Sequence, residues 1–257
     1  MFAIEIDNIT KRYRTNRLRT HLALDHVSLS VKTGEIFGFL GPNGAGKTSL
    51  IKILVGVMSA DEGQCKIVGH DSATRPAKLS LGYLPERPYF HEFLTAEEFL
   101  FFHGRLLGLS DEVIHARIPR MLDKVGLKKQ KEQRLRTFSK GMLQRIGFAQ
   151  ALIHDPEVLI LDEPMSGLAP VGRREVRDII SEVALSGKTI FFSTHIIHDV
   201  EVICSAVGFI NGGKLQGAGN IDSLLGKTVK SMEVRFGLPY GKDPHKIGHL
   251  KFARKTM

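Results

Sequence analysis

The sequence has few cysteines and no long uncharged apolar stretch, and each scarcity excludes a class of protein. Cys65 and Cys204 are its two cysteines and form no Cys-x-x-Cys pair, so neither a zinc site nor a disulfide framework is indicated. No window of 20 residues lacks both charged residues and turn formers, which argues against a transmembrane helix. The opening residues, MFAIEIDNITKRYR, carry acids early and do not have the pattern of a signal peptide. A reducing, cytoplasmic setting is expected.

The balance of charges is basic. Lysine and arginine number 36 against 27 aspartates and glutamates, so the formal net charge is +9. Much of the excess lies in residues 11–19, 128–136 and 251–255. A nucleic-acid surface is one interpretation, but solvated faces near an anionic membrane or a polyanionic nucleotide explain the same residues. Charge alone therefore does not decide the function.

The order of apolar patterns indicates an α/β protein interrupted by helices. Apolar runs predict strands at residues 2–6, 27–31, 35–40, 64–69, 81–85, 157–162, 188–193 and 206–211. Helical patterns cover residues 48–58, 172–185 and 195–204. Three more helices are expected after Thr95, which forms a capping box with Glu98, after Ser110, with a bend at Pro119, and after Ser139.

This order predicts three parts in a chain of 257 residues. The core comprises residues 1–86 and 157–226, and a helical subdomain of residues 87–156 is inserted into it. A short C-terminal tail of residues 227–257 contains a strand-like segment near residues 231–236. A hydrophobic content of 42% is enough for a substantial core, and no internal repeat is present.

The segment from Gly41 to Thr48 matches the phosphate-loop pattern G-x-x-x-x-G-K-[ST], between a predicted strand and a predicted helix. Its glycines let backbone N–H groups turn toward phosphate oxygens, Lys47 carries a positive charge to the β and γ phosphates, and the Thr48 hydroxyl can ligate Mg²⁺. A chance match is expected in roughly 1% of chains of this length. The predicted nucleotide contacts are Gly41, Pro42, Asn43, Gly44, Ala45, Gly46, Lys47, Thr48 and Ser49.

Two acids, Asp162 and Glu163, end a five-residue apolar run. Strand alternation would point their side chains in different directions, which predicts different roles. Asp162 is suited to hold Mg²⁺ through its water shell, and Glu163 to orient or deprotonate the attacking water. The simpler alternative is a pair of acids that cap the end of a strand.

Two aromatic residues are candidates for nucleotide contact. His195 follows a second buried strand and could sense the γ-phosphate, although such a histidine is more often structural. Tyr13 lies in a basic segment that we expect to fall between strands, where its ring could stack on adenine. A surface tyrosine is the commoner outcome, and stacking alone would discriminate poorly among purine bases.

The segment FSKGMLQR, residues 138–145, predicts a helix start with unusual chemistry. Ser139 is a good N-cap, but Lys140 and Gly141 occupy the first turn, where a helix favours acids and avoids glycine. A positively charged start that is rich in N–H donors suits an anion.

Together these residues resemble the nucleotide-binding domain of ABC (ATP-binding cassette) proteins. GPNGAGKT is similar to Walker A, ILDEP to Walker B, SGL (166–168) to the D-loop, STH to the H-loop and Tyr13 to the A-loop, while FSKGMLQR falls where the family has LSGGQ. The resemblance covers about residues 2–225 and implies a RecA-like P-loop NTPase core, an antiparallel β arm and a helical subdomain.

The resemblance also implies ATP and Mg²⁺ as ligands and a head-to-tail pair of cassettes, identical or different, around two ATP molecules. Ser139 and the Gly141 N–H would then contact the γ-phosphate of ATP held by the partner, and Thr48, Asp162 and Glu86 would be close to Mg²⁺. The sequence departs from the family at three places. Lys140 and Met142 alter the signature, Glu86 replaces a glutamine and cannot donate a hydrogen bond, and Ala169 replaces the usual D-loop aspartate.

The GYLPE and SKGM forms resemble the subgroup that serves ABC-2-type exporters. This implies an ATPase subunit that powers export by a separate permease, attached to the inner face of the membrane. The aromatic residues 85–94 lie where a permease's coupling helix docks in the family, unless they pack inward. The alternative is a soluble ABC ATPase acting on nucleic acid or ribosomes, which a single cassette without a coiled-coil insertion disfavours. A switch GTPase or small-molecule kinase is opposed by the absence of an Asn-Lys-x-Asp motif and by the spacing between the signature and Walker B.

Overall fold

The structure is a computed structural model that describes residues 1–16 and 19–221. The predicted strand-like segment near residues 231–236, the basic residues 251–255 and the whole tail of residues 227–257 lie outside the described residues.

A six-stranded sheet forms the centre of the protein, with the strand order β10-β9-β3-β8-β7-β6. Its strands are β3 (Ile36–Leu40), β6 (Leu81–Leu84), β7 (Val158–Leu161), β8 (Thr189–Thr194), β9 (Ala206–Asn211) and β10 (Lys214–Asn220). All neighbouring strands are parallel except β9 and β10. Parallel strands covered on both faces are continuously apolar, which explains why most of them could be predicted and why the glycine-rich β10 at the sheet's edge could not.

The two faces of this sheet belong to two different hydrophobic cores. Leu159 and Leu161 of β7 face the core shared with the helical part of the chain. Val158 and Ile160 of the same strand face the core shared with α1 (Lys47–Leu54) and the second sheet. Because side chains alternate along a strand, one short apolar run joins both halves of the molecule.

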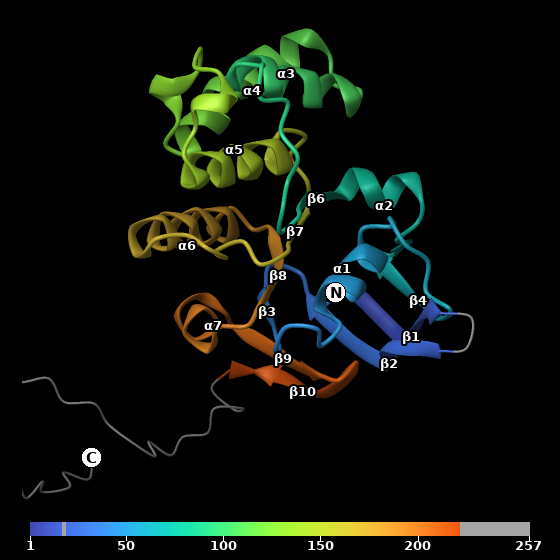
Figure 1. The fold of residues 1–257 in the computed structure, drawn as a ribbon. Helices are drawn as coiled ribbons and strands as arrows, with labels where there is room; N and C mark the ends of the chain where they lie inside the picture. Colours follow the sequence, from blue (N-terminus) through green and yellow to red (C-terminus); the bar gives the residue numbers. More distant parts are fainter. Residues whose placement is uncertain (17–18, 222–257) are drawn as a thin grey trace, which may run out of the picture.

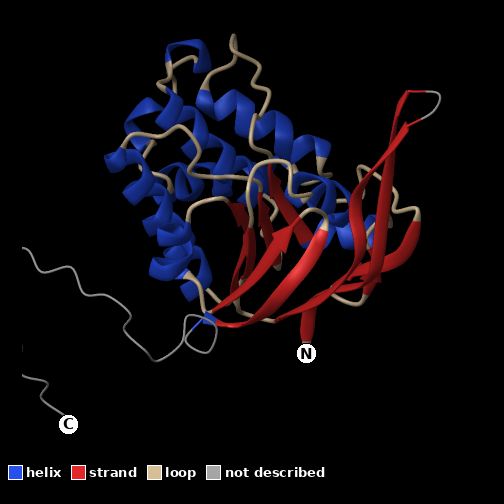
Figure 2. Ribbon diagram, turned by 60° about the horizontal axis from the view of Figure 1, so that its bottom comes forward, coloured by secondary structure: helices blue, strands red, loops and turns tan. Residues whose placement is uncertain are grey.

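The second sheet is the antiparallel arm, with the order β2-β1-β4-β5. Its strands are β1 (Phe2–Asn16), β2 (Arg19–Lys32), β4 (Glu62–Ile67) and β5 (His70–Asp71). The hairpin of β1 and β2 projects from the arm (Figure 2). Our prediction that Tyr13 lies between strands is wrong, because β1 continues through Tyr13, which pairs with His21. The far part of the hairpin is exposed on both faces, so it lacks the one-sided alternation that reveals a strand.

Helices from the middle of the chain gather at one end of the protein (Figure 1). They are α3 (Ala96–Leu106), α4 (Asp111–Lys124) and α5 (Lys140–Leu152), with two 3-10 turns, η1 (Lys128–Gln130) and η2 (Leu135–Thr137). The capping box of Thr95 and Glu98 and the N-caps Ser110 and Ser139 form as predicted. The remaining helices are α2 (Arg75–Ser80), α6 (Pro170–Leu185) and α7 (Ile197–Ile203). None of the described helices is long and apolar enough to cross a membrane.

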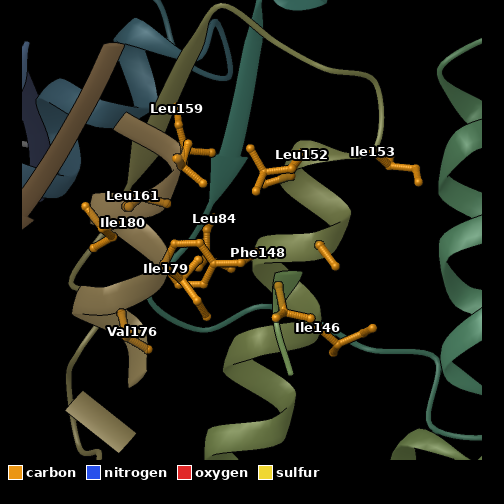
Figure 3. Packing of buried hydrophobic residues seen from close by; sticks show 14 of the residues in the cluster. Leu84, Ile146, Phe148, Leu152, Ile153, Leu159, Leu161, Val176, Ile179 and Ile180 are labelled. Atoms are coloured by element: carbon orange, nitrogen blue, oxygen red, sulfur yellow. The ribbon is translucent and has the colours of Figure 1, made fainter. Parts of the chain in front are cut away.

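Helix α5 is the element through which the helical part packs onto the sheet. Phe148 of α5 is fully buried, and Figure 3 shows it directed toward Leu84 of β6 and Ile179 of α6. Gln144, one turn earlier, donates a hydrogen bond from Nε2 to the Pro164 carbonyl, 2.8 Å away. The start of α5 is thereby tied to the loop that follows β7.

Candidate nucleotide-binding site

A cavity of about 410 Å³ lies at the carboxyl ends of β3, β7 and β8. It is lined by Tyr13, His21, Ala23, Asn43, Gly44, Gly46, Lys47, Thr48, Ser49, Glu86, Glu163, Ser166 and His195. In open α/β sheets, ligands bind at this end of the strands. The structure therefore brings most of the predicted nucleotide contacts into one place.

The phosphate loop depends on two glycines for its shape. Gly46 is the N-cap of α1, with φ 108°, and a Cβ there would lie 2.5 Å from the Ala23 carbonyl oxygen. At Gly41, a Cβ would collide with the Ile210 carbonyl oxygen. Because the first N–H groups of a helix have no intrahelical partner, the start of α1 presents donors and a positive dipole end to the cavity.

Lys47 supplies the positive charge of this cavity. Its side chain is buried, and Nζ donates to the carbonyl oxygens of Gly41 at 2.7 Å and Pro42 at 3.2 Å. The same ammonium lies 3.1 Å from Glu163 Oε1. Gly41, Pro42 and Ala45 thus shape the loop from behind the cavity wall, whereas the other predicted loop residues line it.

The side chains of Asp162 and Glu163 point in different directions, but not for the reason that we predicted. Strand β7 ends at Leu161, before either acid, and Glu163 has a left-handed backbone with φ 47°. Ser193 of β8 holds both: its hydroxyl donates to Asp162 Oδ1 at 2.6 Å, and its oxygen accepts the Glu163 N–H at 2.9 Å. Turn geometry, rather than strand alternation, separates the side chains.

The two carboxylate oxygens of Glu163 face different partners: Oε2 faces His195, and Oε1 faces the ammonium of Lys47. His195 Nδ1 lies 2.9 Å from Oε2, and because a carboxylate only accepts, this nitrogen carries the proton. Oε1 is buried and accepts no hydrogen bond from the described residues, despite its distance of 3.1 Å from Lys47 Nζ. A buried carboxylate oxygen without a donor can accept one from a water in the cavity.

Asp162 and Thr48 form a pair of oxygen donors beside the phosphate loop. Asp162 is buried, and burial raises the pKa of its carboxyl, an effect that hydrogen bonds from Ser193 and Thr48 oppose and the charges of Glu163 and Glu86 reinforce. Carboxylate and hydroxyl oxygens are ligands that Mg²⁺ accepts. Since the two side chains are in hydrogen-bond contact, they fit a shared magnesium ion. Thr48 and Glu86 line the cavity, whereas the buried Asp162 is not part of its lining.

Tyr13 and His195 both line the cavity. The Tyr13 hydroxyl donates to Met58 Sδ at 3.1 Å and shares a hydrogen bond with Ser49 Oγ at 3.2 Å. Its ring forms part of the cavity wall. The His195 side chain is 39% exposed, so its second ring nitrogen is accessible from the cavity.

The predicted signature residues do not line this cavity. Ser139 caps α5 by accepting the Met142 N–H at 3.3 Å, and a Cβ on Gly141 would meet nothing within 4 Å. The Lys140 ammonium lies against Gly167, where it leaves no room for a Cβ. Lys140 lines a second cavity of about 410 Å³, whose other lining residues include Glu86, Gln144 and Ser166.

Sequence reasoning missed four residues that belong to the site. Ser166, within the predicted D-loop, lines both cavities, and the polar end of the strand at residues 188–193 was the available signal for Ser193. His21 and Ala23 carry no motif. They enter the cavity only because β2 pairs with β1 in a particular register.

Comparison with known proteins agrees with this geometry. The family model described as "ABC transporter" matches residues 24–166, more than half of the chain. The chain belongs to the ABC transporter family. Its ABC transporter relatives include an uncharacterised ABC transporter ATP-binding protein of Synechocystis sp., 48% identical over 87% of this chain and 64% of that protein. The chain therefore spans less than two thirds of that relative's length.

Two other members of the family have more specific names. The bacitracin transport ATP-binding protein BcrA of Bacillus licheniformis is 37% identical over 90% of this chain and 74% of that protein. The linearmycin resistance ATP-binding protein LnrL of Bacillus subtilis is 33% identical over 87% of this chain and 71% of that protein. A solved ATP-binding subunit of an ABC transporter superimposes with a TM-score of 0.76 at 29% identity, covering 86% of this chain and 91% of that one. The P-loop NTPase fold with an antiparallel arm and inserted helices is thereby confirmed.

Proposed function

We propose that this chain binds and hydrolyses ATP and thereby drives transport by a separate membrane permease. The observation that carries this proposal is the placement of Glu163: His195 orients Oε2, while the buried Oε1 faces Lys47 and accepts no hydrogen bond from a described residue. It stands 3.1 Å from the phosphate-loop lysine. A base at this position can act on a water near the γ-phosphate.

In this proposal each residue of the site has a separate role in ATP hydrolysis. The N-terminus of α1 and Lys47 hold the phosphates, and the Tyr13 ring offers a face for the base. Mg²⁺, held by Thr48 and Asp162, would neutralise charge on the β and γ phosphates. Glu163 Oε1 accepts a hydrogen bond from the attacking water, and His195 keeps the carboxylate in place and directs its second nitrogen toward the γ-phosphate.

A second cassette completes the site in this proposal. The start of α5 carries the Ser139 hydroxyl and the Gly141 N–H, which has no partner within the helix, and both residues lie outside the cavity that holds the phosphate loop. No acid occupies the first turn of α5, so this end of the helix favours an anion. An ATP molecule held by the phosphate loop of a partner cassette, identical or different, supplies that anion.

The surface of residues 85–94 is our proposed docking site for the permease. Its aromatic side chains are partly packed inward and partly exposed. Phe90 packs inward against Phe99, whereas Tyr89 is 84% exposed and Phe93 67% exposed. Exposed aromatic side chains of this kind favour a protein interface. We also propose residues 87–156 as a subdomain that moves relative to a core of residues 1–86 and 157–226.

Export is the direction of transport that we favour. Two relatives are named for bacitracin transport and linearmycin resistance, and the SKGM and GYLPE forms agree with the exporter subgroup. Attachment to the inner face of the membrane through the permease follows from the same proposal.

Replacing Glu163 by glutamine tests the catalytic assignment. We expect Glu163→Gln to lower ATP turnover by about 10²–10⁴-fold, because an amide cannot accept the proton from water, while Mg·ATP affinity stays within a few-fold. Glu157→Gln, at the opposite end of β7, is the control and should leave turnover unchanged. Near-normal turnover in Glu163→Gln would rule out Glu163 as the base.

A further inference from the structure

His21 stands beside Tyr13 in the wall of the nucleotide cavity, although no motif points to it. The two residues are directly paired across β1 and β2, and both line the cavity. Side chains of directly paired residues lie on the same face of a sheet, with Cβ atoms about 5 Å apart. The imidazole of His21 therefore borders whatever the Tyr13 ring covers.

A β-bulge fixes the position of His21 relative to the phosphate loop. Lys11 pairs with Leu24 and Arg12 with Leu22, so the register shifts and Ala23 has no partner. The carbonyl of this bulged residue packs against Gly46, and its side chain also lines the cavity. Two residues of strand span roughly 7 Å. His21 therefore lies well away from the phosphate end of the cavity, on the side of Tyr13.

On the hairpin side of the cavity, His21 is the described residue that can offer hydrogen-bonding atoms to a ligand. Three hairpin residues line it, and Ala23 has no polar side-chain atom. The Tyr13 hydroxyl is engaged by Ser49 and Met58, so Tyr13 offers a ligand mainly its ring face. The His21 imidazole makes no hydrogen bond or ion pair with any residue that the structure describes. A neutral imidazole offers one acceptor and one donor nitrogen.

We propose that His21 recognises the edge of the nucleobase and accepts a hydrogen bond from the 6-amino group of adenine. This inference rests on the proposed nucleotide binding and adds a specificity-determining residue to it. Stacking on Tyr13 tolerates any base because every base has a π-face. A hydrogen bond to the base edge supplies the discrimination that stacking lacks.

Binding of ADP, which is not hydrolysed, tests the proposal with a set of ligands that differ by one group each. Calorimetric titration in the presence of Mg²⁺ would compare ADP, purine riboside diphosphate without the 6-amino group, 2′-deoxy-ADP and inorganic pyrophosphate. We expect His21→Ala to weaken ADP about 3- to 10-fold, the loss of one hydrogen bond, and 2′-deoxy-ADP equally. Purine riboside diphosphate and pyrophosphate should bind both proteins alike.

Two further variants separate the hydrogen bond from the shape of the hairpin. His21→Gln keeps an acceptor and should retain most of the ADP affinity. Leu22→Ala alters the neighbouring residue, which does not line the cavity, and should bind all four ligands as the unaltered protein does.

Three results would overturn the inference while leaving nucleotide binding intact. The first is an ADP affinity that is unchanged in His21→Ala. The second is an equal loss of ADP and pyrophosphate affinity in this variant, which would indicate a distorted phosphate loop. The third is a loss of ADP affinity that is not seen with 2′-deoxy-ADP, which would place the contact at the ribose. Failure of the unaltered protein to bind either ADP or pyrophosphate would instead overturn the proposed function, and this inference with it.

Discussion

The starts of α1 and α5 both combine glycine with lysine, but the fold constrains them in opposite ways. At α1, Gly46 needs a positive φ and meets the Ala23 carbonyl, and Lys47 is buried among carbonyl oxygens. At α5, Gly141 has open space around it and no positive φ. The first glycine is required by the packing of this chain. The second is not, which agrees with the proposal that a ligand approaches α5 from outside.

The two helix starts also differ in whether the charge of their lysine is balanced by nearby acids. Lys47 Nζ lies 3.1 Å from Glu163 Oε1, and the buried Asp162 is hydrogen-bonded to Thr48, the next residue. Lys140 is exposed and forms no ion pair with any residue in the described part of the chain. One site therefore balances its charges internally. The other presents an unbalanced cation, which suits an anionic ligand delivered by a partner.

Removing the glycine at α1 should have the largest effect on stability. Gly46→Ala forces a side chain into a left-handed backbone and against the Ala23 carbonyl oxygen, which should cost about 2–4 kcal/mol. We expect the melting temperature to fall by roughly 4–16 °C. Gly44→Ala is the matched control, because Gly44 also has a positive φ, 79°, but nothing within 4 Å of its Cβ position. An equal loss in both variants would show that crowding at Gly46 contributes nothing.

Replacing the buried acid Asp162, beside α1, by asparagine should change the stability less than Gly46→Ala does, and should raise it. Burial raises the pKa of Asp162, so the ionised carboxylate costs stability at neutral pH. Asp162→Asn should therefore unfold at a higher temperature at pH 7.5 and bind Mg·ATP more weakly. The gain should shrink as the pH falls through the raised pKa of folded Asp162 and vanish below the ordinary pKa of aspartate, where the carboxyl is protonated in both folded and unfolded states.

Urea titrations across pH 4–8 would check this prediction. Asp123→Asn, on an exposed carboxylate of α4, is the control and should show little change. A pH-independent difference between Asp162→Asn and the unaltered protein would contradict the electrostatic explanation.

Replacing the glycine at α5 should have the smallest effect on the monomer. Gly141→Ala removes a flexible residue from the first turn of a helix without a clash, so stability should be unchanged or rise by up to about 1 kcal/mol. Thermal unfolding would measure this. A clear destabilisation would mean that the fold of this chain does need Gly141, and the contrast between the two helix starts would be lost.

The parts of the site that could be predicted from sequence are those in which chemistry is encoded locally. The phosphate loop has its glycines, Lys47 and Thr48 within eight residues, and the buried strands before the loop and before Asp162 are continuously apolar. The left-handed turn at Glu163 could not be predicted, because nothing in ILDEP distinguishes it from a strand end. His21 and Tyr13 meet through strand register and a bulge, which depend on the pairing of the exposed ends of β1 and β2 rather than on either segment alone.

The most direct test of the central claim is whether the start of α5 completes a site in a second molecule. Light scattering of the Glu163→Gln protein with Mg·ATP should show a dimer that is absent without nucleotide, and addition of Ser139→Ala, which removes the hydroxyl, should raise the protein concentration needed for pairing at least tenfold. The affinity of the monomer for ATP should not change. Pairing that is indifferent to Ser139→Ala, or an equal loss of ATP binding by the monomer, would contradict the account.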